Sequence, residues 1–297
     1  MSDRNLVVVS LLTARQEFQR QQEQDARAAA ARSGLRVEVV FAENDPRAQI
    51  QQLEEFIRRP PERRPAAFVI ETVAAVGFEK IARAALSARI GWVVVSSRAP
   101  YLEMLHKEFP GSLVTSATID EMEIGRIQGR QILALLPAGG NVLYVEGPSM
   151  SAATIFRRRM AEQELKGSVV SIVHTISGDW TAAGAEWAVS SWLGIDESRE
   201  VRFDLVGAQN DEMAMGARAA LAAQRPDWSG PFTGCDGLVN LGQRYVREGQ
   251  LAATVVKATT AGPGVELVAK SLRGEPVPPQ VVLPPASFPA LEELKKG

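Results

Sequence analysis

Residues 6–41 decide the fold class, because Leu6–Leu12 (LVVVSLL) and Leu35–Phe41 (LRVEVVF) flank a different kind of segment, Phe18–Ser33. The two flanking runs are rich in β-branched residues, which favour strands. The segment between them is rich in Ala, Gln and Arg and is followed by Gly34, a pattern typical of a helix and its C-terminal cap. A strand, a helix and a second strand in this order predict a parallel strand pair joined by a crossover helix.

The same alternation continues along both halves of the chain. In the first half it predicts strands over 66–70, 91–96 and 113–117 and helices over 46–58 and 78–88. It then restarts, with predicted strands over 141–145, 169–176, 203–207, 230–235, 251–257 and 280–283 and predicted helices over 122–136, 154–165, 182–193, 213–223, 238–248 and 264–272. Two successive units of this kind indicate an α/β fold with two doubly wound parallel-sheet lobes.

Composition narrows the function classes. The chain has 297 residues, which fits about two domains. Lys plus Arg number 33 and Asp plus Glu 35, so nothing in the net charge of −2 attracts nucleic acid or an anionic membrane. One cysteine, Cys235, and two histidines argue against a disulfide, a cysteine zinc cluster or a multi-histidine metal site. We expect no metal and no cofactor, and Cys235 as a small buried residue, not a reactive thiol.

The start of the chain leaves two compartments open. The first predicted strand begins five residues after Met1, without the longer apolar core and cleavage site of a signal peptide. The chain as written is therefore expected in the cytoplasm, and in the periplasm if a leader preceded it. No apolar run reaches the ~18–20 residues of a spanning helix, so membrane insertion is not expected.

Four motifs occur in a specific order. They are Gly178–Thr181 (GDWT), Ala208–Ala217 (AQNDEMAMGA), Gly234–Gly237 (GCDG) and Gly249–Val255 (GQLAATV). On these residues the chain resembles the ribose-binding-protein-like family of type I sugar-binding proteins, which are related to lac-repressor effector domains. The resemblance covers essentially the whole chain.

The resemblance implies a two-lobed binding protein with a hinge. One lobe takes residues 1–118 and 258–283, and the other takes 119–257 and 284–297. Crossovers are expected near Thr118, Lys257 and Pro284, with a ligand bound between lobes that close by a hinge motion.

The family's ligand residues can be carried over where the motifs match. The resemblance implies ligand contacts by Asn210, by the Asp236 carboxylate and by the Trp180 ring, because sugars present hydroxyls around an apolar ring face. Each has a structural alternative: Asn210 caps the following helix, Asp236 serves the turn before Gly237, and Trp180 packs in a core.

Four further residues depend on register. Ser97 and Arg98 stand where the family usually has Asp-Arg, so both are candidate ligand residues, although Ser97 lacks the family's carboxylate. The alternative for Arg98 is an arginine at the surface or between the lobes. The family's ligand arginine best overlays Arg157, and an alternative register places Thr154 there.

The chain also departs from the family pattern. Glu71, Glu121 and Lys257 replace residues that are usually uncharged, and the loop after the first strand offers Arg15, Glu17 and Phe18 in place of an Asn and two stacking aromatics. We hypothesise a ligand that is a charged metabolite or a sugar derivative, not simple ribose, and micromolar binding of ribose or glucose in calorimetry would defeat this. The alternative is that pairs such as Glu71 with Lys257 neutralise each other.

No sequence motif of an enzyme is present: GxGxxG, GxxxxGK[ST], GxSxG and HExxH are all missing. We therefore expect a monomeric, non-catalytic solute-binding protein that serves an ABC-type importer through its permease. The alternative is a cytoplasmic sensor that passes lobe closure to a signalling protein. Strand one starts too early for a helix-turn-helix head, so DNA binding is not expected.

Overall fold

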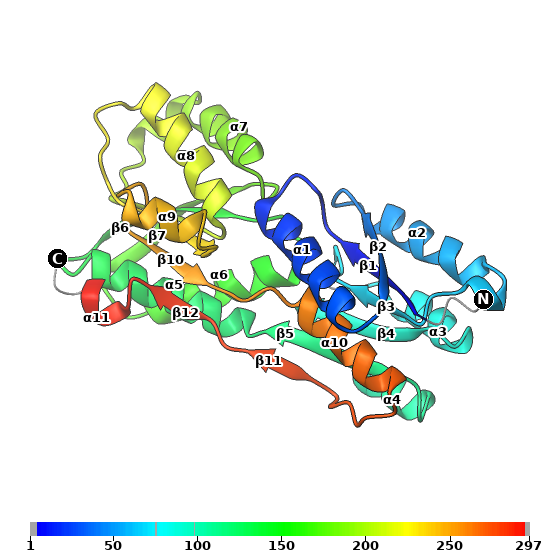
Figure 1. The fold of residues 1–297 in the computed structure, drawn as a ribbon. Helices are drawn as coiled ribbons and strands as arrows, with labels where there is room; N and C mark the ends of the chain where they lie inside the picture. Colours follow the sequence, from blue (N-terminus) through cyan, green and yellow to red (C-terminus); the bar gives the residue numbers. More distant parts are fainter. Residues whose placement is uncertain (1–4, 75, 98, 295–297) are drawn as a thin grey trace. The chain divides into compact units, whose positions relative to one another are not determined.

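The computed structural model describes residues 5–74, 76–97 and 99–294. The chain divides into two compact units, the first formed by Met1–Ile119 with Thr259–Leu283 and the second by Asp120–Ala258 with Pro284–Gly297. Figure 1 labels their elements along the sequence.

The first unit is built on a six-stranded sheet in the order β2-β1-β3-β4-β5-β11. All its neighbouring strands pair in parallel. The strands are β1 (Leu6–Leu11), β2 (Arg36–Phe41), β3 (Ala67–Ile70), β4 (Gly91–Ser96), β5 (Val114–Ile119) and β11 (Val281–Leu283). The helices are α1 (Glu17–Arg32), α2 (Pro46–Arg58), α3 (Glu79–Ser87), α4 (Leu102–Glu108) and α10 (Ala261–Leu272). Because β1 lies between β2 and β3, the strand order reverses there, which is where sheets of this kind bind ligands.

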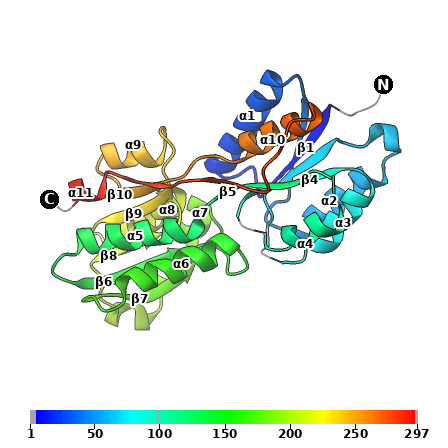
Figure 2. The same ribbon diagram turned by 90° about the horizontal axis from the view of Figure 1, so that it is seen from below.

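Alternation along the strands explains why both faces of this sheet are covered. Val7 and Val9 of β1 pack with α1 and α10, whereas Val8 packs with α2, α3 and α4. In Figure 2 the same two groups of helices lie on opposite sides of the strands. Successive side chains of a strand point to opposite faces, so a continuous apolar run such as β1 requires a helix layer on each.

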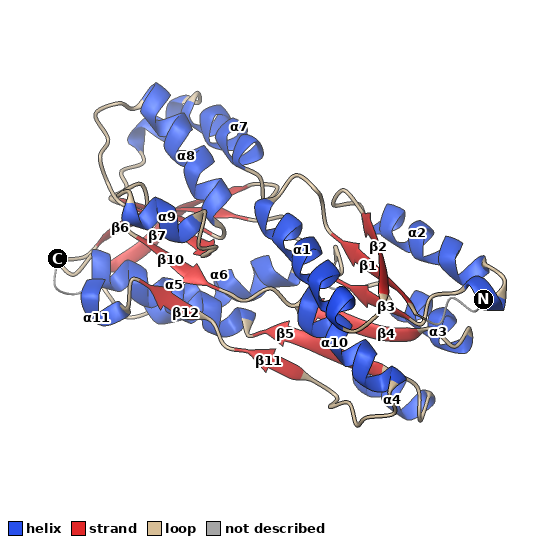
Figure 3. Cartoon of the chain, viewed as in Figure 1, coloured by secondary structure: helices blue, strands red, loops and turns tan. Residues whose placement is uncertain are grey.

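The second unit repeats this plan with the sheet order β7-β6-β8-β9-β10-β12. Its strands are β6 (Gly140–Glu146), β7 (Val170–Ser177), β8 (Leu205–Ala208), β9 (Phe232–Asp236), β10 (Ala253–Val256) and β12 (Ala286–Phe288), which is antiparallel to β10. The helices are α5 (Glu121–Leu135), α6 (Ala152–Leu165), α7 (Ala182–Leu193), α8 (Asp211–Gln224), α9 (Gly242–Arg247) and α11 (Leu291–Leu294). Figure 3 shows helices and strands alternating in both units. Two doubly wound sheets confirm the predicted fold class.

The sequence analysis did not predict every helix and strand correctly. The helix α4 and the strand β12 were not predicted, and α9 starts at Gly242, four residues later than expected. β12 is only three residues long and lies between prolines, so it offers no detectable alternation. Gly237 has a φ of +59°, a left-handed conformation that keeps residues just after β9 out of a helix.

Helices α5 and α6 approach closely at Gly125, and replacing this glycine by alanine is expected to destabilise the protein by about 1–3 kcal/mol. A Cβ at position 125 would lie 2.3 Å from the backbone oxygen of Arg157, so the two helices would have to separate. Guanidinium unfolding measures the loss. Gly194→Ala is the control, because a Cβ there meets nothing closer than 3.5 Å. Equal midpoints for the two variants would contradict the close approach.

Candidate functional site

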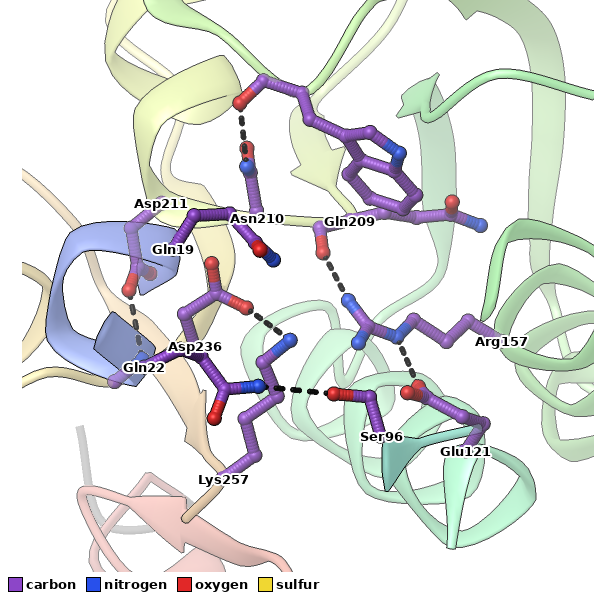
Figure 4. Close-up of polar contacts among 12 residues, drawn as sticks. Gln19, Gln22, Ser96, Glu121, Arg157, Gln209, Asn210, Asp211, Asp236 and Lys257 are labelled. Atoms are coloured by element: carbon purple, nitrogen blue, oxygen red, sulfur yellow. Dashed lines mark hydrogen bonds and ion pairs between the residues drawn. The ribbon is translucent and has the colours of Figure 1, made fainter. Parts of the chain in front are cut away.

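Polar side chains gather where the strands of the second unit end (Figure 4). Asp236 is the last residue of β9, Lys257 follows β10, and Asn210 lies two residues after β8. Carboxyl ends of parallel strands share one edge of a sheet, so these residues from separate segments become neighbours.

Asp236 and Lys257 form an ion pair with 2.9 Å between Oδ1 and Nζ, and each side chain is only 8% exposed. The Asp236 backbone has a φ of +100°, which is unusual for a residue other than glycine. Burial works to lower the pKa of Lys257, but the neighbouring Asp236 carboxylate raises it, and the net shift is upward. Lys257 is therefore held as a cation beside Asp236.

A second buried ion pair joins α6 to α5. The Arg157 Nε lies 2.6 Å from the Glu121 carboxylate, with side chains 1% and 4% exposed. Arg157 also donates to the backbone oxygen of Gln209 at 2.6 Å, and its guanidinium lies 5.7 Å from the Trp180 ring centroid. Burial opposes the charge on Arg157, but the carboxylates of Glu121 and Asp236 favour it and its pKa is raised.

Thr154 lies on the same helix as Arg157 and is 3% exposed. Its hydroxyl has no hydrogen-bond partner among the described residues. The preference for Arg157 over Thr154 as the ligand residue stays a prediction.

Asn210 is the N-cap of α8. Its Oδ1 accepts from the backbone N–H of Met213 at 2.8 Å, and its Nδ2 donates to the backbone oxygen of Trp180 at 2.8 Å. The helix-capping interpretation is therefore present in the structure, while the ligand contact stays a prediction. A capping amide still has one N–H and one lone pair available to a solute.

Asp211 does not share this capping contact. It is fully buried and accepts hydrogen bonds from the Thr254 hydroxyl at 2.6 Å and the Gly237 N–H at 2.8 Å. Burial and the nearby Asp236 carboxylate raise the pKa of Asp211 well above its usual value. The carboxyl anchors the turn that follows Asp236.

Trp180 belongs to the core around α7 and α8 and is 7% exposed. An added Cβ at Gly147 would lie 2.1 Å from a ring carbon of Trp180, so the indole packs directly on that glycine. The core-packing alternative for Trp180 thus has direct support, and its role as a ligand wall stays a prediction.

In the first unit, Glu71 follows β3 and Ser97 follows β4. The Glu71 carboxylate accepts from the side-chain amides of Gln19 at 3.0 Å and Gln22 at 3.2 Å, and the residue is 8% exposed. Ser97 is half-buried, and its backbone N–H bonds the oxygen of Val95.

The loop residues of the first unit lie differently. Phe18 is 2% exposed within α1. Arg15 is exposed and pairs with Glu43, and the half-buried Glu17 pairs with Arg20. Arg98 lies outside the described residues.

Sequence reasoning missed the residues that hold the site in place. Gln19, Gln22 and Asp211 carry contacts that no motif of the sequence predicts. The sequence signal that could have identified the two glutamines is their spacing. Gln16, Gln19 and Gln22 recur at every third residue at the start of a helix, so they lie on one face.

Cys235 is fully buried in β9, and burial raises the pKa of its thiol to about 12. We expect native protein to resist a thiol-specific disulfide reagent at pH 8, because the thiolate is the reactive form. The guanidinium-unfolded chain, as the control, should react promptly with one equivalent. Rapid reaction of the native protein would contradict this burial.

Among the described residues, no three His, Cys, Asp or Glu side chains converge as a metal site. Within the same residues, none of the helices combines the length and apolar character needed to span a bilayer.

Comparison with known proteins adds three kinds of similarity. A family model described as the periplasmic binding protein domain matches residues 7–275. A Rhizobium meliloti protein with the provisional name rhizopine-binding protein is 25% identical over 258 residues, which cover 84% of this chain and 79% of that protein. The ribose import binding protein of Salmonella typhimurium is 26% identical, over 61% of this chain and 60% of its own length.

Solved structures share the fold over nearly the whole chain. A Bacillus halodurans ABC transporter solute-binding protein with bound myo-inositol superposes with a TM-score of 0.81 at 21% identity, covering 99% of this chain and 97% of its own. A Mycobacterium smegmatis protein in complex with β-D-fucofuranose gives 0.82 at 21% identity, covering 98% and 93%.

Proposed function

Because the chain belongs to the periplasmic binding protein family, we propose that it is the solute-binding component of an ABC importer and that its solute is an uncharged sugar or polyol. The proposal draws on relatives whose names include ribose import and on similar folds that hold myo-inositol or a furanose. The predicted absence of catalysis agrees with membership of a family of binding proteins.

The observation that carries the choice of solute is the Asp236–Lys257 pair. Its carboxylate and ammonium, 2.9 Å apart, present a strong acceptor beside a strong donor at the strand ends. A hydroxyl both donates and accepts, so neighbouring hydroxyls of a polyol match such a pair.

Charge pairing supports an uncharged solute. In the described part of the second unit, Lys257 and Arg157 each face a carboxylate, Asp236 and Glu121. The sequence analysis named Glu71 with Lys257 as an example of neutralisation. The ion pairs Asp236–Lys257 and Glu121–Arg157 have different members but the same effect. These two cations of the described second unit are therefore already neutralised within the protein, which favours neutralisation over the charged-ligand hypothesis.

A thermal-shift screen followed by calorimetry tests the proposal. The panel is D-ribose, L-arabinose, D-allose, D-fructose and myo-inositol, with D-glucuronate and D-glucosamine as charged comparisons. A bound solute at 100 times its Kd stabilises the folded protein by about 2.7 kcal/mol. Stabilisation by a neutral member is the expected result, and stabilisation by charged members alone would overturn the uncharged class.

An importer component acts outside the cytoplasmic membrane, and we propose this location in place of the cytoplasm. Fractionation of cells that express the native gene tests it, and accumulation with cytoplasmic markers would favour the sensor alternative. The hinge motion stays a prediction, which small-angle scattering with and without a stabilising sugar can test.

A further inference from the structure

Gln22 of α1 is a fully buried side chain with contacts in two directions. Its Oε1 accepts from the backbone N–H groups of Thr260 at 2.7 Å and Ala261 at 2.8 Å. Its Nε2 donates to the Glu71 carboxylate at 3.2 Å and to the Ser96 hydroxyl at 3.0 Å, with the Thr260 hydroxyl at 3.3 Å. One amide thus joins four segments of the first unit.

The two ends of this amide have separable tasks. The oxygen serves the start of α10, whose N-cap Thr260 makes no side-chain capping bond, so Gln22 supplies the missing acceptor. The nitrogen faces the carboxyl ends of β3 and β4, where Glu71 and Ser96 lie. A substitution at position 22 that keeps the acceptor but removes the donor therefore separates the role of Gln22 in folding from its role beside Glu71 and Ser96.

Hydrogen bonds hold both the backbone and the side chain of Glu71. Its N–H bonds the oxygen of Ser10, its oxygen accepts from the Gln49 amide at 2.8 Å, and Gln19 donates to the same carboxylate oxygen as Gln22. With the main chain fixed in this way, the amide donors restrict the remaining freedom, which is the direction of the carboxylate.

We propose that Gln22 is a positioning residue, which aims the Glu71 carboxylate at a bound solute without touching that solute itself. The proposal rests on the proposed function, since it assigns Gln22 a role in binding the proposed solute. Gln22 is fully buried whereas Glu71 is 8% exposed, so the effect of Gln22 on binding is expected to pass through Glu71.

The test uses Gln22→Glu, which keeps an oxygen for the Thr260 and Ala261 N–H groups but turns a carboxylate toward Glu71. The matched control is Gln24→Glu, the same change at an exposed position of the same helix. Glu71→Gln and the double variant Gln22→Glu/Glu71→Gln complete a cycle, because the double variant restores a donor–acceptor pair in reverse. Each variant is measured for melting temperature without solute and for Kd with the panel sugar that binds the wild type most tightly.

Gln22→Glu is expected to weaken binding by about tenfold or more and to lower the melting temperature, whereas Gln24→Glu changes neither. In the double variant the melting temperature should recover. Its Kd should match that of Glu71→Gln within about threefold, because Gln22 acts through a carboxylate that is no longer there.

Three outcomes would overturn the proposal, and they are distinguishable. Wild-type affinity in Gln22→Glu with a lowered melting temperature would leave Gln22 a structural residue only, with the proposed function intact. If the loss of affinity in the double variant equals the product of the losses in the two single variants, Gln22 acts independently of Glu71. If no panel sugar binds the wild type, the proposed sugar or polyol class fails first and the positioning role falls with it.

Discussion

Replacing Arg157 by methionine is expected to lower the free energy of unfolding by about 3–5 kcal/mol. The substitution leaves the Glu121 carboxylate, 4% exposed, without its cation, and it removes the donor to the Gln209 backbone oxygen. A buried charge that loses its partner keeps its desolvation penalty and gains nothing in return. Guanidinium unfolding followed by circular dichroism measures the change.

Arg159→Met is the control for this prediction. Arg159 lies on the same helix but is exposed, so its substitution should change stability by no more than about 0.5 kcal/mol. A double variant with Glu121→Gln should recover part of the loss caused by Arg157→Met, because it removes the stranded charge. Equal stability of the Arg157 and Arg159 variants would show that the buried pair contributes nothing.

Replacing Lys257 by methionine is expected to cost about 3 kcal/mol. Asp236 is a residue that is 6% exposed and has a φ of +100°. In the variant its carboxylate loses the ammonium that lies 2.9 Å away in the wild type. We place the loss at the lower end for buried pairs because both side chains lie at the strand ends and retain some contact with solvent. The measurement is again equilibrium unfolding, at pH 7 and without sugar.

Neutralising the remaining partner should reverse much of this loss. Asp236→Asn added to Lys257→Met removes the unpaired carboxylate, so the double variant should be more stable than Lys257→Met alone. The same double variant should bind no panel sugar with wild-type affinity. A double variant less stable than either single one would refute the ion pair as the source of the effect.

The fold was predictable from the sequence because the inner strands of the two sheets are buried on both faces. Leu6–Leu11 and Gly91–Ser96 are continuous apolar or small runs next to helical segments, and this pattern permits few architectures. The missed elements are those without such a pattern. β12, Ala286–Phe288, is short and partly exposed, and its pairing with β10 depends on contacts distant in sequence.

The placement of Asp236 and Asn210 at strand ends was predictable from the sequence, whereas the partners of the charged side chains were not. Asp236 and Asn210 could be assigned to strand ends because the boundaries between strands and helices can be recognised in the sequence. The partners of the charged residues cannot be recognised in this way, since Arg157 meets a carboxylate 36 positions away on another helix. Gln22 likewise bonds Thr260 across 238 positions, a contact that only packing creates.

The left-handed backbone of Asp236 has a consequence for any attempt to make this protein more robust. A non-glycine residue held there carries a conformational penalty of about 1–3 kcal/mol, which glycine would relieve. Yet glycine would also delete the acceptor beside Lys257. The Lys257 ammonium would then keep its desolvation cost without a partner, so the loss of the ion pair offsets the relief of the backbone, and glycine at position 236 offers no net gain in thermostability.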